Sequence, residues 1–379
     1  MTKSLFDTYH LGRLALSNRL VMNPMTRSRA DAEGRESELT ATYFAQRASA
    51  GLIVVGSVAP SPNGKGYPRT PGLWSAEQVE SWKATTKAVH AAGGHIFAQL
   101  MHSGRVAHPA NMTAGARIVA PSALGLGGQT SFGSAQMWTD SGGMQPFPVP
   151  EQLDEAGIEQ AKNEFVSAAK NAIEAGFDGV EIHAANGYLL EQFLSPVTNH
   201  RRDGYGGSID RRLRFVVEVA EAVAEAIDSD RVGIRISPYA EINRMQEYPE
   251  IDETYLALSK RLVSLRLVYL HVADQFGVSS GGPGRHAGLD ALKPKLREAW
   301  GTRTFFIGGN FNKESAARAV KEGLVDLVGF GKAFLANPDL VRRFREGLPL
   351  NAPDETTFFT PGPKGYTDYP MWVRPRSIS

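Results

Sequence analysis

Eight short apolar runs alternate with amphipathic helical segments along most of this 379-residue chain. Because parallel strands need a crossover between them, such alternation favours a parallel sheet. The expected strands are 19–23, 52–58, 96–100, 179–183, 232–236, 268–272, 304–307 and 324–330. The expected helices are 37–50, 76–92, 153–175, 210–227, 251–263, 289–300 and 313–321. Eight units of similar length predict a closed (β/α)8 or TIM barrel rather than a doubly wound open sheet.

The length suits a single barrel domain over residues 1–379, since such barrels run from about 200 to over 400 residues. Two segments depart from the alternation of strands and helices. Residues 102–150 are rich in Gly, Pro and Ser and are predicted to form a surface excursion over the C-terminal face. The Gly-rich segment 273–286 fits a lid and an unstructured linker equally well. The tail from Asn351 is expected to fold back over the barrel.

Charge and composition narrow the class of function. At a net charge of +1, nothing in the sequence argues for nucleic acid, an acidic partner or a membrane surface as a binding partner. We expect a small-molecule substrate. The absence of cysteine excludes disulfides, thiolate nucleophiles and cysteine-ligated metal centres, and we expect no metal site. No stretch approaches the roughly 20 apolar residues of a membrane span, so we expect a cytoplasmic protein. Nothing in the sequence distinguishes a monomer from a homodimer.

The fourth predicted strand ends in the most informative motif, VEIHAANGYLLEQFLSP at 180–196. The strand breaks at His183 and the chain resumes with helical spacing after Tyr188. His183 and Asn186 can both donate hydrogen bonds to one ligand oxygen, and Tyr188 can deliver a proton. Each residue alone is typical of a cap or a core position. Three such groups within six positions at a strand exit indicate an active site.

The last two strands carry a phosphate signal. One ends in Gly308-Gly309-Asn310 and the other in Gly329-Phe330-Gly331-Lys332. Barrels often bind phosphate with the loops after strands seven and eight, through backbone N–H groups and a nearby helix start. Each glycine pair alone is weak, because glycine also ends strands for conformational reasons. With a lysine attached, the two pairs predict a phosphorylated ligand.

The remaining strand exits suit a planar heterocycle. Thr26 can tune a ring carbonyl, the Gln99 amide can pair with a ring edge, and Arg235 can stabilise an anionic ring. Ser57 stands at the exit of the second strand. Taken singly, these residues fit an ordinary polar layer of a barrel or a structural ion pair. Together they describe a flavin mononucleotide (FMN) pocket.

The chain resembles the old yellow enzymes, the FMN-dependent ene-reductases. The resemblance covers nearly the whole length and rests on long motifs: NPMTRSR at 23–29, YFAQRASAGLIVV at 43–55, GYPRTPGLWS at 66–75, AQLMHSGR at 98–105, EAGFDGVEIHAANGYLLEQFLSP at 174–196, RRDGYGGSIDRR at 201–212, VGIRISP at 232–238, GGNF at 308–311, GFGKAFLANPDL at 329–340 and GYTDYP at 365–370.

The resemblance implies FMN at the C-terminal mouth of the barrel, with NADPH or NADH as the reductant. The activated C=C bond of an α,β-unsaturated carbonyl compound or a nitroalkene would be reduced, and nitrate esters or nitroaromatics are further acceptors in this family. It also implies a role for each site residue. The edge of the isoalloxazine ring would meet Pro24, Thr26, Ser57 and Gln99, with Arg235 near N1 and C2, and the phosphate would be held by Gly309, Asn310, Gly331 and Lys332. The substrate oxygen would bind His183 and Asn186, and the proton would come from Tyr188. The substrate space would be lined by Tyr67, Met101 and Phe359.

Four positions bear on phosphate binding, on the substrate range and on the branch of the family to which the chain is similar. Lys332 stands where the family usually has Arg, which keeps the charge but loses the bidentate fork. Met101 and Phe359 replace a common Trp and Tyr, so the substrate range of relatives does not transfer directly. Thr26 stands where one branch of the family has Cys, which makes this chain similar to the classical branch.

Two other hypotheses for the function are a non-redox barrel lyase or isomerase acting on a sugar phosphate, and a flavin-binding protein without catalysis.

Overall fold

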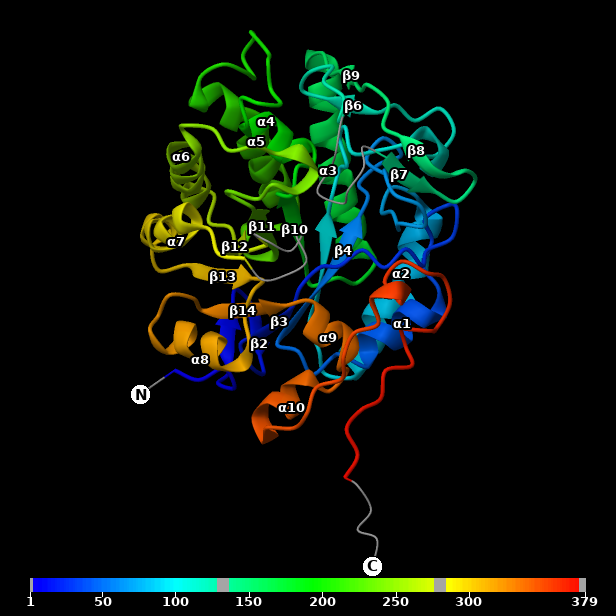
Figure 1. Cartoon of the computed structure of the whole chain (residues 1–379), viewed down its shortest axis with the longest axis vertical. Helices are drawn as coiled ribbons and strands as arrows, with labels where there is room; N and C mark the ends of the chain where they lie inside the picture. The colour runs from blue at the N-terminus through cyan, green and yellow to red at the C-terminus, as the bar shows by residue number, and fades with distance from the viewer. Residues whose placement is uncertain (1–2, 128–135, 276–283, 375–379) are drawn as a thin grey trace, which may run out of the picture.

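The computed structural model describes residues 3–127, 136–275 and 284–374, and these form a closed eight-stranded parallel barrel surrounded by helices (Figure 1). The barrel strands, in order around the barrel, are β3 (Leu20–Met22), β4 (Leu52–Val58), β5 (Ile96–Leu100), β10 (Gly179–Ala184), β11 (Val232–Ile236), β12 (Tyr269–Ala273), β13 (Thr304–Gly308) and β14 (Leu327–Phe330). All eight predicted strands and the TIM barrel are therefore confirmed. The largest difference is in β14, which begins three residues later than predicted because 324–326 belong to the turn before it.

The predicted helices are also present, with ends that differ by a few residues. They are α1 (Glu38–Ala45), α2 (Ala76–Ala91), α3 (Glu155–Glu174), α5 (Ile209–Ile227), α6 (Ile251–Ser264), α7 (Ala287–Trp300) and α8 (Lys313–Lys321). The helical segment after Tyr188 is α4 (Leu189–Leu194). Two short helices were not predicted, α9 (Lys332–Ala336) and α10 (Leu340–Glu346), because Pro338 interrupts the helical pattern between them. Single 3-10 turns lie at Pro109–Asn111, Ser229–Arg231, Ile242–Arg244 and Glu355–Thr357.

Side chains at the helix starts explain several of these boundaries. Ser75 and Gln78 form a reciprocal capping box at the start of α2. Asp154 accepts a hydrogen bond from the backbone N–H of Gly157 and so caps α3. Each of these bonds satisfies an N–H group that has no partner within the helix, which is why the helices begin there.

The interior has two main layers of apolar packing. One lies between the strands and the surrounding helices and contains the fully buried Trp82 and Trp300. The other fills one end of the barrel, where Leu11 and Leu16 pack against barrel side chains such as Phe97. Leu11 and Leu16 belong to an N-terminal hairpin, β1 (Tyr9–Leu11) with β2 (Leu14–Leu16). Since these side chains come from before the first barrel strand, the hairpin closes the N-terminal end and leaves the opposite end for a ligand.

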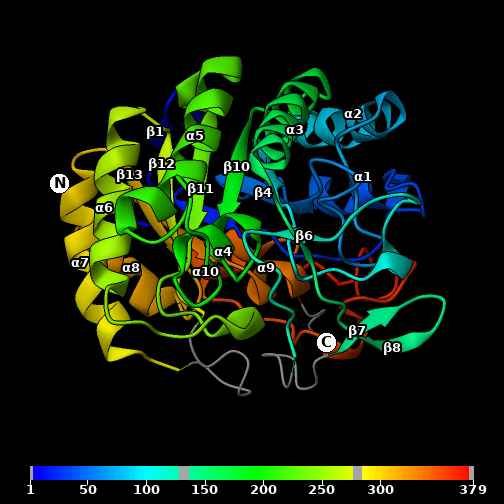
Figure 2. The same ribbon diagram turned by 90° about the horizontal axis from the view of Figure 1, so that it is seen from above.

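The predicted excursion lies over that opposite end. It contains β6 (Val119–Ala120) paired with β9 (Glu151–Gln152), and the hairpin of β7 (Gln136–Thr139) with β8 (Gly143–Pro146). Figure 2 shows β7 and β8 at the lower edge of the molecule, on the side away from β1. Leu126 and Met137 of the excursion pack against Met101 and Tyr188, so the excursion covers the mouth of the barrel as expected.

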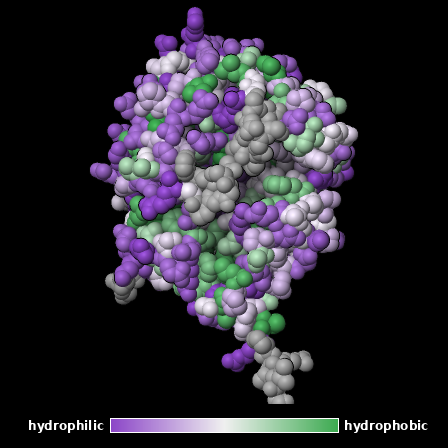
Figure 3. All heavy atoms as spheres, viewed as in Figure 1, coloured by the Kyte–Doolittle hydropathy of each residue, from purple (hydrophilic) through white to green (hydrophobic). Residues whose placement is uncertain are grey.

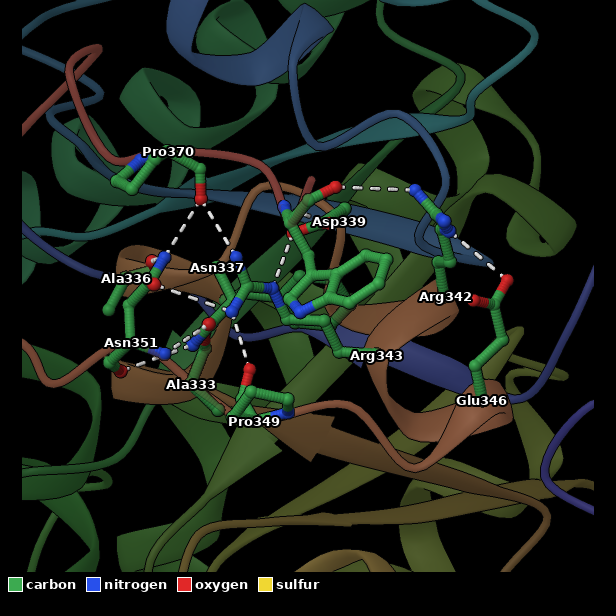
Figure 4. A network of polar contacts seen from close by, with 12 residues as sticks. Ala333, Ala336, Asn337, Asp339, Arg342, Arg343, Glu346, Pro349, Asn351 and Pro370 are labelled. Atoms are coloured by element: carbon green, nitrogen blue, oxygen red, sulfur yellow. Dashed lines mark hydrogen bonds and ion pairs between the residues drawn. The ribbon is translucent and has the colours of Figure 1, made fainter. Parts of the chain in front are cut away.

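The C-terminal tail returns to the barrel. Arg27 and Arg29, in the loop after β3, donate hydrogen bonds to tail carbonyls such as those of Phe358 and Gly365, and Tyr366 stacks on Tyr43 of α1 with 4.0 Å between ring centroids. A second network ties the tail to α10. The buried Arg343 of α10 binds Asp339 and the carbonyls of Pro349 and Pro370, as Figure 4 shows.

The segment predicted as a lid or a linker, 273–286, lies partly outside the described residues, because 276–283 are not among them. At its two ends, β12 runs to Ala273 and α7 begins at Ala287. Within the described residues, no helix is long and apolar enough to cross a membrane.

Candidate active site

His183 and Arg235 mark the centre of the open end. They sit side by side in the parallel register of β10 and β11, and both are almost fully buried. His183 Nδ1 and Arg235 Nε and Nη2 are buried nitrogen atoms that have no hydrogen-bond partner among the described residues. Burial, together with the charge of Arg235, holds the pKa of His183 well below its usual value, so the imidazole is neutral. The site thus offers a neutral imidazole next to a guanidinium that lacks an acceptor.

The turn after β10 holds Asn186 in an unusual conformation. Asn186 has a φ of 57° and Gly187 a φ of 75°, both in the left-handed region. The Asn186 N–H donates to Ser237 Oγ at 2.7 Å, and its carbonyl accepts from Asn243 Nδ2 at 2.8 Å. The Gly187 N–H donates to the Glu191 carboxyl group at 2.5 Å. Bonds from three other segments therefore fix the backbone, while Asn186 Oδ1 is buried without a partner in the described structure.

Tyr188 completes the motif predicted on this turn. Its hydroxyl lies 3.0 Å from the hydroxyl of Tyr67, and its ring meets the His183 ring edge-on with 5.0 Å between centroids. Asn243, which donates to the Asn186 carbonyl, also lies near enough to both tyrosine hydroxyls to lower their pKa values. Burial raises the pKa of Tyr188 above its usual value, although Tyr67, Asn243 and Arg235 oppose the rise. The phenol is consequently protonated at neutral pH and can donate a proton.

A buried carboxylate lies deeper in the barrel. Glu181 accepts hydrogen bonds from Gln99 Nε2 at 2.7 Å and from His271 Nδ1 at 2.8 Å, and it is fully buried. Burial alone would raise the pKa of Glu181, but His271, Arg235 and Gln99 hold it below its usual value. Burial lowers the pKa of His271 to about 4, so this pair is a carboxylate with a neutral imidazole. Since Gln99 uses its N–H2 group for Glu181, its carbonyl oxygen can accept from a ligand.

The residues expected at the flavin edge lie together at the exits of β3, β4 and β5. Thr26 Oγ1 is 3.2 Å from Ser57 Oγ. A side chain added at Gly56 would lie 2.5 Å from Pro24 Cβ and 2.7 Å from Gln99 Oε1, which shows how closely the three exits approach. The tertiary structure thus brings Pro24, Thr26, Ser57 and Gln99 to one side of the site.

The residues expected to bind phosphate follow β13 and β14, but most have other partners. Gly309 has a φ of 122°, and a Cβ there would lie 2.0 Å from the Asp274 carbonyl oxygen, so the backbone by itself requires glycine. Asn310 Nδ2 donates to Asp274 and to the Gly284 carbonyl, each at 3.1 Å. Lys332 begins α9 and forms an exposed ion pair with Glu355, and a Cβ at Gly331 would lie in ordinary contact with Met25 Sδ at 3.4 Å. Phosphate binding by these residues remains a prediction.

Two of the three predicted pocket residues lie together. Met101 is buried in an apolar cluster with Tyr188, and Tyr67 packs against the same cluster. Phe359 differs: its side chain is 56% exposed, and its ring contacts Phe358 edge-on at 6.4 Å. Its backbone carbonyl accepts a hydrogen bond from Arg69 Nη2 at 2.9 Å, and the contacts of its side chain do not place it in the site.

These groups fit an isoalloxazine ring. Such a ring offers an imide N–H, carbonyl oxygens and a developing negative charge, and the site presents a Gln99 carbonyl, two hydroxyl groups and the guanidinium of Arg235 without an acceptor. On the face of the molecule seen in Figure 1, apolar residues gather toward the centre and the lower part, between hydrophilic ones (Figure 3).

Among the described residues, no cluster of three or more His, Asp or Glu side chains could hold a metal ion.

Five residues of the site were not predicted: Glu181, Glu191, Ser237, Asn243 and His271. A charged residue within the apolar run VEIH was a usable signal for Glu181, because an unpaired buried carboxylate is costly. Asn243 and Ser237 gave no local signal, since Asn and Ser are ordinary residues in loops.

Comparisons with known proteins agree with this geometry. Residues 4–351 match the NADH:flavin oxidoreductase / NADH oxidase family, whose cofactor is FMN. The chain is 41% identical over 362 residues to a probable flavin mononucleotide-dependent alkene reductase of Leishmania infantum, covering 95% of each chain. It is 38% identical over 385 residues to 12-oxophytodienoate reductase 7 of Oryza sativa subsp. japonica, covering 98% of this chain and 96% of the relative.

Solved structures show the same similarity. Morphinone reductase superposes with a TM-score of 0.91 at 39% identity, covering 98% of this chain and 97% of that one. The old yellow enzyme homologue from Zymomonas mobilis superposes with a TM-score of 0.90 at 38% identity, covering 98% and 100%. Family, sequence and structure agree with the motifs, and the chain belongs to the NADH:flavin oxidoreductase / NADH oxidase family as a member of the old yellow enzymes.

Proposed function

We propose that this protein is an NAD(P)H-dependent ene-reductase that acts, as one catalytic domain, on α,β-unsaturated carbonyl compounds or nitroalkenes. The observation that carries the proposal is that His183, Asn186 and Arg235 meet at one barrel mouth with buried polar atoms that have no partner among the described residues. Tyr188 lies beside them, with its hydroxyl 3.0 Å from that of Tyr67. The relatives support it, since they include an alkene reductase, and morphinone reductase has been solved with tetrahydroNAD.

FMN, when bound, supplies hydride transfer from NAD(P)H to the alkene. Pro24, Thr26, Ser57 and Gln99 would hold the edge of the ring, with Arg235 stabilising negative charge on it. Gly309, Asn310, Gly331 and Lys332 would hold the phosphate. For Asn310 and Lys332 this requires exchanging or sharing their present partners, Asp274 and Glu355.

On the substrate side, His183 and Asn186 would donate hydrogen bonds to the carbonyl or nitro oxygen and withdraw electron density from the alkene. Tyr188 would protonate Cα, for which its high pKa is suited because the group stays protonated at neutral pH. Tyr67 and Met101 would line the space beside it.

The visible absorption spectrum of the purified protein tests the proposal directly. We expect a yellow protein that releases FMN on heating, identified by mass, and that consumes NADPH faster when cyclohex-2-enone is added. A colourless folded protein, or release of FAD, would contradict FMN binding. A yellow protein whose NADPH consumption ignores the enone would be a flavin-binding protein without this activity.

A further inference from the structure

Glu191 is a buried carboxyl group with no ion-pair partner among the described residues, and the roles assigned above do not use it. It lies in the first turn of α4 and is 2% exposed. It accepts three hydrogen bonds: Oε1 from Ser237 Oγ at 2.8 Å and from Tyr255 OH at 2.5 Å, and Oε2 from the Gly187 N–H at 2.5 Å. Only a carboxylate accepts three such bonds without presenting a donor of its own.

Ser237 passes this arrangement on to Asn186. Its hydroxyl has a single hydrogen, which it donates to Glu191, so its oxygen is left to accept the Asn186 N–H at 2.7 Å. Glu191 therefore holds Gly187 directly and Asn186 through Ser237. Both turn residues are in the left-handed region, which a non-glycine residue occupies only when its surroundings hold it there.

We propose that Glu191, acting through Ser237, is a positioning residue that fixes the Asn186–Gly187 turn and so aims the Asn186 amide at the substrate oxygen. This inference rests on the proposed function, in which Asn186 binds that oxygen. Loss of Glu191 or Ser237 should loosen the turn and weaken the binding of ligands that carry such an oxygen, while the flavin edge, which is built on β3, β4 and β5, stays intact.

The chain offers a matched pair of variants. Ser237→Ala and Tyr255→Phe each delete one hydroxyl donor to Glu191, but only Ser237→Ala also deletes the acceptor of the Asn186 N–H. Ser259→Ala is a control for the loss of a buried hydroxyl, since Ser259 Oγ has no partner in the described structure. Glu191→Gln places an amide N–H2 among three donors and should act at least as strongly as Ser237→Ala.

The probes are cyclohex-2-enone as substrate and a simple phenol titrated into the holoenzyme by flavin absorbance. At pH 8 we expect Ser237→Ala to raise the KM for the enone and the Kd for the phenol about 5- to 100-fold, with KM changing more than kcat. Ser259→Ala should stay near wild type at every pH, and Tyr255→Phe should reach wild-type values once the pH lies above its own raised midpoint. Equal effects of Ser237→Ala and Tyr255→Phe, or no effect of Ser237→Ala in a folded flavin-bound protein, would overturn the inference.

The dependence of KM on pH distinguishes the positioning role of Glu191 from a purely structural one, which would not change it. Burial raises the pKa of Glu191 to about 7, although its three donors and Arg235 oppose the rise. Since the positioning form is the carboxylate, the KM for the non-ionising enone should fall as the pH rises through about 7. Tyr255→Phe removes a donor to the carboxylate and should move that midpoint upward, and Glu191→Gln should abolish it. A midpoint unchanged in Tyr255→Phe would contradict the role of Glu191.

Other titratable groups near Glu191 must be considered in reading the profile. Glu191 borders a recess whose other ionisable residues, from the loop after β11 and from α6, are Tyr239, Glu241, Glu247, Tyr248 and Tyr255. Arg235 of β11 also acts on the Glu191 carboxyl group through its charge. Burial raises the pKa of each of the three tyrosines, so they remain neutral near pH 7.

Should the wild-type protein bind no flavin or reduce no enone, the proposed function fails. That outcome is distinct from failure of the comparison between Ser237→Ala and Tyr255→Phe.

Discussion

Replacing Tyr188 by Phe separates chemistry from structure at the proposed proton donor. The substitution removes one hydroxyl and keeps the ring, which retains its edge-on contact with His183. The Tyr188 hydroxyl lies 3.0 Å from the Tyr67 hydroxyl, and the substitution removes this hydrogen bond. The expected loss of folding stability is about 1 kcal/mol, the net value of one intramolecular hydrogen bond.

The expected loss in catalysis is larger. General acid catalysis contributes about 10²- to 10⁴-fold, which corresponds to about 2.7–5.5 kcal/mol of barrier. The half-reaction in which the enone is reduced needs a proton at Cα and should slow by this factor. Reduction of the bound flavin by NADPH needs no proton from Tyr188 and should remain close to the wild-type rate. Nitroalkenes should be less affected, since a nitronate is stable enough to be protonated later.

Stopped-flow absorbance measures the two half-reactions separately, and Tyr67→Phe serves as the matched control. It breaks the same hydroxyl–hydroxyl bond from the other side but leaves the proton on Tyr188, so its effect on enone reduction should be at most about tenfold. Equal slowing of both half-reactions in Tyr188→Phe, or equal effects of the two variants, would refute the role of Tyr188 as the acid.

Four further substitutions and one control test other parts of the structure. His183→Ala and Asn186→Ala should each slow enone reduction about 10²- to 10³-fold and weaken phenol binding while FMN stays bound, and unchanged steady-state rates would contradict their role. Lys332→Ala should weaken FMN binding in a fluorescence titration and weaken the salt dependence of that binding, whereas unchanged binding would show that the phosphate relies on backbone groups. Arg343→Ala should lower the free energy of unfolding by about 3–5 kcal/mol, because it leaves the buried Asp339 carboxylate of Figure 4 without its ion-pair partner and removes a donor to the Pro349 carbonyl. Arg342→Ala, whose side chain is half exposed, should change it by less than about 0.5 kcal/mol in the same denaturant titration, and similar losses in the two variants would refute the argument.

Much of the fold could be predicted because hydrophobic periodicity is a local property of the chain. A run such as 52–58 reads as a buried strand without knowledge of its neighbours, and alternation with helices then requires parallel pairing. Parallel strands end on the same side, so His183, Gln99 and Arg235 could be placed at one mouth from the sequence alone. The short helices α9 and α10 were missed because Pro338 divides the segment into pieces of five and seven residues, which are too short for a helical period to show.

The contacts that hold the site in place were decided by the tertiary structure. Glu181 and His271 are 90 positions apart, and Ser237 and Glu191 are 46 apart, yet each pair forms a hydrogen bond of 2.8 Å. Such bonds depend on the register of neighbouring strands and the course of the loops to within a fraction of an ångström, which residue types do not specify. The sequence by itself thus determined the barrel and the chemistry available at its mouth. Only the closed barrel decided which groups hold Asn186 in its turn and which acceptors Arg235 lacks, because both depend on segments that meet only after folding.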